Sequence, residues 1–201
     1  MNELLKRNNK ITEAITSNIR DYFYGHQHKV RWYGKDSASF EPRISNRQDG
    51  IYLVSIFNIP MYIGQSALNI KQRITRWIKV LMGEEHNTEF HSLGNDLKKV
   101  SETYNINPQV FIDNATVSFL SLSELKDYFS HEVFPNQTLF GLENLTIKDF
   151  EDKDVLEYFE QVMMEKIGPV SNRNLNGFSQ SKTSNTQEFN NALKELTKKV
   201  A

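Results

Sequence analysis

Two tyrosines ten residues apart mark the part of the chain whose residue types could do chemistry. Tyr52 closes the tripeptide GIY, Tyr62 opens the tripeptide YIG, Arg73 follows eleven residues after Tyr62, and Glu160 comes much later. A guanidinium matches the oxygens of a phosphate, a carboxylate is a hard metal ligand, and a tyrosine hydroxyl can take part in proton transfer. These groups suit hydrolysis of a phosphodiester, which needs an activated water, stabilised phosphoryl charge and help for the departing alkoxide.

The proton acceptor for such a reaction stays open between several residues. The ordinary pKa of tyrosine is about 10, so Tyr52 or Tyr62 would need a nearby cation or metal to lower it. His86 and His91 are rival bases. A single protein carboxylate, Glu160, that leaves most ligand positions to water and phosphate suits Mg²⁺, and Mn²⁺ could replace it.

The two tyrosines require a strand hairpin to bring them together. Residues 51–57 are β-branched and aromatic and predict a strand. Residues 58–60 predict a turn, and a second strand starts at 61 and is broken by residues 64–66.

Arg73 and Glu160 require helices. Asn69 predicts the cap of a helix whose apolar positions, 70, 74, 77, 78 and 81, form one stripe with Arg73 at its edge. A later helix, with Glu160 at the edge of its stripe, begins at a capping box of Asp154 and Glu157 and ends at residues 168–169.

The remaining segments are assigned more coarsely. Apolar spacing predicts helices at 3–23, 93–104 and 188–200, and residues 109–122 hold two strand-like runs. Residues 25–49 predict an irregular basic loop with interleaved aromatics, and residues 179–187 predict a polar linker.

The ordered features resemble the GIY-YIG endonuclease family. In that family an arginine lies on a helix after the second tyrosine, and a glutamate on a later helix is followed by a proline nine residues on and an asparagine twelve residues on; Pro169 and Asn172 fit this spacing after Glu160. The resemblance spans about residues 50–174. It implies an α/β (α+β) fold with a small central antiparallel sheet flanked by helices.

The resemblance also implies an activity. A member of this family would be a Mg²⁺-dependent DNA endonuclease leaving 5′-phosphate and 3′-hydroxyl ends. It would use Tyr52 as the base, with Tyr62 beside it and Asn172 ordering the far side of the site. The catalytic set would be Tyr52, Tyr62, Arg73, Glu160 and Asn172, with Glu160 as the metal ligand.

Three features depart from the family pattern. Trp77 stands where some members have histidine and others tyrosine, four residues after Arg73. Gln65 stands where lysine or a small residue is common, so a lysine that lowers the tyrosine pKa would come from elsewhere, for example Lys71. The long gap from Arg73 to Glu160 implies an inserted segment at about 101–150.

Domain boundaries follow from these assignments. We expect an N-terminal helix and basic loop at 1–45, a nuclease core with its insertion at 46–178, and a linker with a C-terminal helix at 179–201. With no cysteine, a cysteine-rich zinc module is excluded. A compact chain is most similar to a type II restriction endonuclease, which would cut duplex DNA as a homodimer at a palindromic site. The alternatives are a non-catalytic DNA-binding module on the same scaffold and a phage-encoded or structure-specific nuclease without sequence preference.

Charge is sorted along the chain in blocks. The net charge is −1, but residues 1–80 carry a balance of +7 and residues 101–165 a balance of −10. A basic face could meet DNA while an acidic one faces elsewhere. The expected DNA-binding residues are Lys29, Arg31, Arg43, Arg47, Lys71, Arg76 and Lys79.

The composition indicates the setting of the protein. The 201 residues are 38% hydrophobic and 24% charged, which is typical of a globular domain and not of a disordered chain. The longest strongly apolar run is seven residues, too short to span a membrane, and the first ten residues hold no apolar signal segment. We therefore expect a cytoplasmic protein with no membrane partner.

Overall fold

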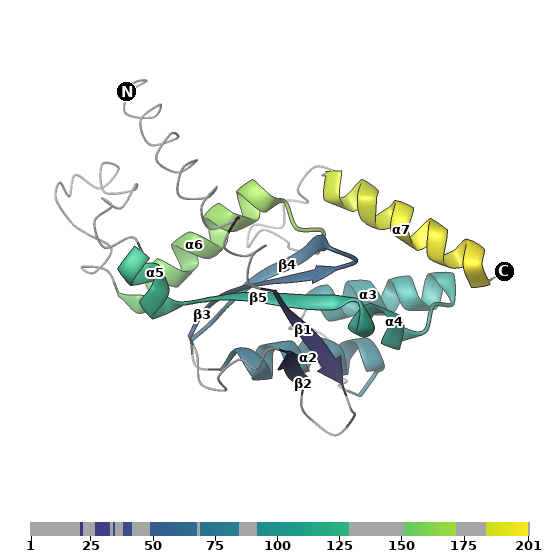
Figure 1. Ribbon diagram of the computed structural model, residues 1–201, viewed down its shortest axis with the longest axis horizontal. Coiled ribbons are helices and arrows are strands. Elements are labelled where there is room, and N and C mark those ends of the chain that lie inside the picture. The colour runs from purple at the N-terminus through teal and green to yellow at the C-terminus, as the bar shows by residue number, and fades with distance from the viewer. Residues whose placement is uncertain are drawn as a thin grey trace.

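A single antiparallel sheet organises the computed structural model, which describes residues 21, 27–32, 34, 38–41, 49–67, 69–84, 92–128, 151–171 and 184–200. Its strand order is β2-β1-β5-β3-β4 (Figure 1). The strands are β1 (Gln27–Trp32), β2 (Ala38–Glu41), β3 (Gly50–Ile56), β4 (Ile59–Ser66) and β5 (Ala115–Ser121). The helices are α2 (Ile70–Met82), α3 (Ser92–Tyr104), α4 (Pro108–Asp113), α5 (Leu122–Tyr128), α6 (Asp152–Ile167) and α7 (Ser184–Val200). The expected antiparallel sheet with flanking helices is confirmed, and the helix expected at 3–23 falls outside the described residues except for residue 21.

The β3–β4 hairpin forms as the sequence predicts, with a tighter turn. Phe57 and Asn58 have φ angles of 55° and 63°, so the loop is a two-residue turn one position earlier than expected. Pro60 belongs to β4, where a missing N–H is tolerated because β4 is an edge strand. The strand also continues through residues 64–66, which were expected to break it.

Strands β1 and β2 pair in antiparallel fashion where an irregular loop was expected. Val30 and Trp32 are buried, and Lys29 and Arg31 alternate with them toward the other face of the sheet. The alternation of charged and apolar residues at 29–32 is the sequence pattern of a half-buried strand. The hairpin is held on α2 by Thr75, whose Oγ1 accepts a hydrogen bond from the N–H of Ala38 at 3.1 Å.

Strand β5 lies at the centre of the sheet. It pairs with β3 over its whole length, from Gly50 opposite Ser121 to Ile56 opposite Ala115, and with β1 on its other side. Residues 115–121 fall in the segment expected to hold an insertion, yet they form the strand without which the two hairpins would have no common neighbour. Residues 129–150, the last part of that segment, are outside the part that the structure describes.

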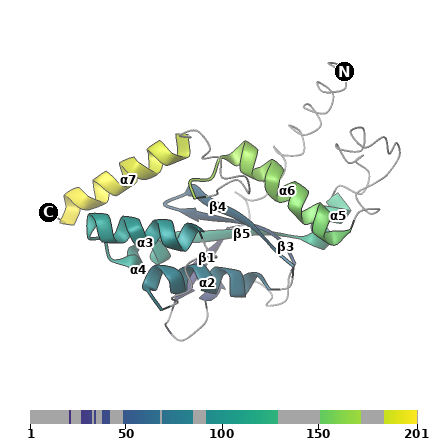
Figure 2. The same cartoon turned by 180° about the vertical axis from the view of Figure 1, so that it is seen from behind.

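Helices α2, α3 and α4 cover one face of the sheet (Figure 2). Ile70, Ile74, Trp77 and Ile78 of α2 are fully buried against the sheet, so the predicted apolar stripe is confirmed. Trp77 is therefore a core residue. Residues 110–112, read as a strand, belong instead to α4, which begins after Asn107 with proline in its first turn.

Helices α5 and α6 pack on the opposite face. Ile51, Leu53 and Ile63 of the sheet meet Val155 and Phe159 of α6 in a second, smaller core. The capping box expected at residues 154 and 157 is absent, because α6 begins at Asp152 and its cap residue, Glu151, makes no side-chain capping bond. Its end is as predicted, with Gly168 in the left-handed conformation at φ 60°.

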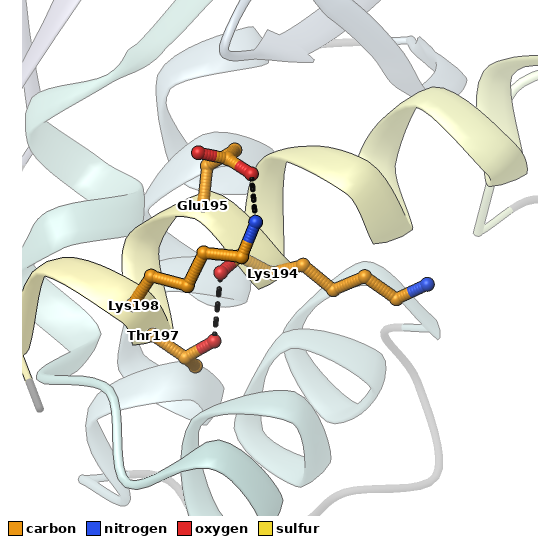
Figure 3. Close-up of polar contacts among 4 residues, drawn as sticks. All are labelled: Lys194, Glu195, Thr197 and Lys198. Carbon is orange, nitrogen blue, oxygen red and sulfur yellow. Dashed lines mark hydrogen bonds and ion pairs between the residues drawn. The ribbon is translucent and has the colours of Figure 1, made fainter.

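Helix α7 includes the residues expected to form the C-terminal helix and starts earlier, at Ser184. Phe189 and Leu193 are buried in the larger core, and the Asn185 side chain donates hydrogen bonds to the carbonyls of Ile167 and Gly168, at 2.6 and 2.8 Å. Its outer face is polar: Lys198 pairs with Glu195 at 2.7 Å (Figure 3). The last turn of α6 is therefore tied to the first turn of α7.

Candidate active site

The β3–β4 pairing brings Tyr52 and Tyr62 to one face of the sheet. Tyr52 lies opposite Gly64 and Tyr62 opposite Val54, so the two rings are diagonal neighbours. Their centroids are 6.1 Å apart, with the ring planes tilted by 40°. A register irregularity follows immediately, between Val54 and Ser55. Such an irregularity re-aims side chains and is common beside functional sites.

Gly64 gives the two rings the room they occupy. A Cβ atom at this position would lie 2.7 Å from both Cζ and the hydroxyl of Tyr52, and 2.7 Å from Cε1 of Tyr62. The glycine of the YIG tripeptide is therefore required by packing.

Arg73 reaches the tyrosines from α2. The helix follows β4 directly, and Asn69 caps it as predicted, its Oδ1 accepting the N–H of Gln72 at 3.2 Å. Arg73 lies in the second turn and is exposed. Its positive charge lowers the pKa of Tyr52, Tyr62 and Glu160, so the guanidinium is close enough to act on all three.

Glu160 comes from α6, on the other face of the sheet. Since β4 is an edge strand, groups from the two faces can meet beside it. The pKa of Glu160 is raised to about 7, chiefly by burial; Arg73 lowers it, the charge of Glu157 raises it, and a hydrogen bond from the side chain of Gln65 lowers it. The register puts Gln65 opposite Ile51, which faces α6.

Both tyrosine hydroxyls hold their protons at neutral pH. Burial raises the pKa of Tyr52 well above its ordinary value, and the neighbouring Tyr62 raises it further. Burial and the charge of Glu160 raise the pKa of Tyr62 to about 12. The Tyr52 hydroxyl donates a hydrogen bond to that of Tyr62, which favours ionisation of Tyr62 over Tyr52. Either tyrosine needs further positive charge before it can act as a base.

The donor set is compatible with a weakly chelated hard cation. Among the described residues, no group of three or more histidine, aspartate or glutamate side chains is placed to hold a metal. Glu160 could supply one carboxylate to Mg²⁺, which commonly retains several water ligands. Gln65 would then be an outer partner that orients the ligating carboxylate.

Several expected site residues fall outside the described part of the chain: Asn172, Arg43, Arg47, His86 and His91. The residue before Asn172 is described. The N–H of Ser171 donates to the carbonyl of Met61 at 2.8 Å, and the N–H of Val170 donates to the carbonyl of Pro60 at 3.2 Å. The segment that follows α6 therefore runs along the outer edge of β4 as far as Ser171, which bonds the residue before Tyr62.

The expected DNA-binding cations do not share one face. Lys29 and Arg31 lie on the sheet face away from α2. Lys71 is roughly 160° around the helix from Arg73, so it does not take the place of a lysine beside the tyrosines. Arg76 and Lys79 are half-buried, and Arg76 follows Arg73 by three residues, on a neighbouring part of the helix surface.

Gln65 and Glu157 are neighbours of Glu160 that sequence reasoning did not identify. Gln65 stood out only as a departure from a family pattern, and Glu157 was assigned to a cap. In the structure Glu157 lies half-buried one turn before Glu160 and pairs with Lys153 at 3.6 Å. The two-residue alternation of β4 was the signal that would have put Gln65 on the face toward α6.

Comparison with protein-family models, with curated proteins and with solved structures finds no match. Among the helices that the structure describes, none has the length and apolarity needed to span a bilayer.

Proposed function

We propose that this chain is a Mg²⁺-dependent endonuclease of the GIY-YIG type, which hydrolyses phosphodiester bonds in duplex DNA. The observation that carries the proposal is the meeting of Tyr52, Tyr62, Arg73 and Glu160 at one edge of the sheet. Glu160 is 87 residues from Arg73 in the chain and lies on a helix of the opposite face. Surface residues chosen for their spacing alone have no reason to converge in this way.

Each of these side chains has a role that its surroundings support. Arg73 is exposed and permanently charged, so it can hold the phosphoryl oxygens of a backbone phosphate. Glu160 would hold the metal, which when bound activates water and stabilises charge on the phosphoryl group. The hydrogen-bonded tyrosine pair can receive a proton from water once further positive charge lowers its pKa.

The finer proposal is a type II restriction endonuclease that acts as a homodimer on a specific site. A two-fold symmetric dimer brings two such sites to the two strands of a palindrome. The pattern of cleavage products distinguishes this activity from that of a nuclease without sequence preference.

The test is cleavage of long duplex DNA with Mg²⁺ by the wild-type protein and by the Glu160→Ala and Arg73→Ala variants. We expect discrete bands from wild type and none from either variant. Matched controls are Asp154→Ala, an exposed carboxylate of α6, and Lys99→Ala, an exposed cation of α3, and both should cleave as wild type does.

Other results would revise the proposal at different points. A smear would reject sequence-specific restriction and keep the nuclease. DNA binding without cleavage on any DNA form would favour the non-catalytic binding module. Full activity of Glu160→Ala would show that Glu160 is not the metal ligand.

A further inference from the structure

A cavity of about 310 Å³ lies beside the candidate active site. It opens where β4 ends and α2 begins. Its lining consists of Ser66, Ala67, Asn69, Gln72, Arg73 and Arg76. Arg73 therefore belongs both to this cavity and to the group formed with the tyrosines and Glu160.

The chemistry of the lining fits an anion. Two of the six residues carry a guanidinium, three are uncharged and polar, and none is acidic. The two arginines are three residues apart on α2, so their side chains leave the helix from neighbouring positions. The first turn of α2 also contains no acidic residue, so nothing there repels a negative charge.

The polypeptide around the cavity is fixed before any ligand arrives. Ser66 Oγ accepts a hydrogen bond from the N–H of Asn69 at 3.0 Å, and Asn69 Oδ1 accepts one from the N–H of Gln72. The N–H of Gln72 is thus already used, so an anion here would be held by the side chains rather than by the end of the helix. The amide N–H₂ group of Asn69 can still donate.

We propose that this cavity binds the backbone phosphate adjacent to the scissile one on the same DNA strand. The inference rests on the proposed function for the position of the scissile phosphate, which Arg73 holds. Arg73 lines the cavity and also belongs to the group with the tyrosines and Glu160. A phosphate in the cavity is therefore the immediate neighbour of the scissile phosphate. Arg76, Asn69 and Gln72 then hold the flanking phosphate and fix the register of the strand.

The experiment measures binding of a 25-base-pair duplex without cleavage. All proteins carry Glu160→Gln, and affinity is measured over a range of salt concentrations without divalent metal. We expect Arg76→Gln to weaken binding roughly tenfold. It should also reduce the slope of log affinity against log salt by about 0.9, the value for one lost phosphate contact.

The control removes the same charge elsewhere. Lys99→Gln, on α3 and outside the cavity, should leave both affinity and slope close to those of the parent. Arg76→Lys keeps the charge and loses the forked donor, so its slope should match the parent while its affinity falls. Thermal unfolding of each variant checks that the fold is intact.

The outcomes separate this inference from the proposed function. Equal affinity and slope for Arg76→Gln and Lys99→Gln would overturn the inference even if the wild-type protein cuts DNA. Loss of one phosphate contact in Arg76→Gln supports the inference even if no cleavage is found, in which case the catalytic proposal alone fails. Absence of DNA binding by the Glu160→Gln parent overturns the inference.

Discussion

The carboxyl group of Glu160 binds a proton more tightly in the folded chain than a free glutamate does. Its pKa of about 7 results first from burial, with the charge of Glu157 adding to it. A metal held by Glu160, as proposed above, would bind the ionised form, so metal and proton would compete for this group. Activation by Mg²⁺ should therefore become easier as the pH rises through 7.

Replacing Glu160 with glutamine should change how stability depends on pH. A carboxyl group whose pKa is raised from 4.5 to about 7 on folding stabilises the folded state below its unfolded pKa, and that contribution is lost as the pH rises to 7. When the pH is raised from 5 to 8, the free energy of unfolding of the wild type should fall by on the order of 2 kcal/mol relative to that of Glu160→Gln. Urea unfolding at the two pH values measures this, with Asp154→Asn as control. If the difference in unfolding free energy between wild type and Glu160→Gln is the same at both pH values, the raised pKa of Glu160 is contradicted.

Replacing Gln65 with leucine should alter the use of metal. The variant loses the hydrogen bond that favours the ionised form of Glu160, so the pKa of Glu160 should rise above 7. At pH 7 we expect the Mg²⁺ concentration for half-maximal cleavage to increase about tenfold. At pH 9 the carboxyl group of Glu160 is ionised in both proteins, so their Mg²⁺ concentrations for half-maximal cleavage should be closer to each other. Gln109→Leu, which disturbs only a surface contact to Asp113 on α4, is the control.

At the level of residues, the order and spacing of motifs identify four members of the site but not their surroundings. Tyr52, Tyr62, Arg73 and Glu160 are separated by intervals that the sequence displays directly. Gln65 was missed because its contact joins residues 95 positions apart, on a strand and a helix that approach only in the folded chain. Trp77, in contrast, was predictable as a core residue, because it belongs to the apolar stripe of its helix.

Strand β4 is the element on which the candidate site depends most. It carries Tyr62 and Gly64 on one face of the sheet and Gln65 on the other. One strand thereby contacts both the group around Arg73 on one face and the carboxylate from α6 on the other. Its place at the edge of the sheet makes this possible.

Substituting alanine at Gly64 should separate the tyrosine pair. Two atoms of the fully buried Tyr52 and one of Tyr62 stand 2.7 Å from where the new Cβ would lie, so at least one ring must move. We expect cleavage to fall by about a hundredfold, because misplacement of reacting groups by about 1 Å has that effect.

Measurements of metal binding and of DNA binding distinguish displaced tyrosine rings in the Gly64→Ala variant from loss of the fold. They should change much less than the cleavage rate, since Arg73 and Glu160 come from other elements. Wild-type rates in the alanine variant would show that the tyrosine arrangement does not matter.

Elements with strong local signals were predictable, and short ones were not. Helix α2 has both a capping asparagine and a continuous apolar stripe. Helix α4 has six residues, and its apolar run at 110–112 is equally consistent with a strand. Asn107 followed by proline was the missed signal, since it is typical of a helix start. Strand β1 was missed although charged and apolar residues alternate at 29–32, because only four residues show that alternation.

Across the whole molecule, the end of the chain holds the helix that carries Glu160. Asn185 of α7 bonds the last carbonyls of α6, while at the other end Lys126 of α5 pairs with Asp152. Helix α6 is therefore fixed at both ends by segments far from it in sequence. The position of Glu160 depends on residues that never touch it.

Replacing Asn185 with alanine should weaken this connection. Two carbonyls lose a partly buried donor, which should cost about 1–2 kcal/mol in the free energy of unfolding. Urea unfolding measures the loss, and Asn190→Ala, an exposed asparagine of the same helix, should be near neutral. Equal stability of the two variants would mean that α7 does not hold α6.

The charge blocks of the sequence correspond only in part to surfaces of the molecule. Cations of the +7 block separate in the fold, because Lys29 and Arg31 point away from α2. A linear sum of charges contains no information about which face of a strand a residue occupies. Within the acidic block, Glu160 is close enough to Arg73 for the two charges to interact, and Glu157 acts in turn on Glu160.

The central place of β5 has a consequence for how the chain folds. Each hairpin can close over a short loop, but pairing of β1 with β5 joins Gln27 to Ser118, 91 residues apart. Such long-range pairing slows folding, and until it occurs β1 and β3 each present an unpaired edge to other chains. The yield on refolding from denaturant should therefore fall as protein concentration rises, and losses should stop once β5 has inserted.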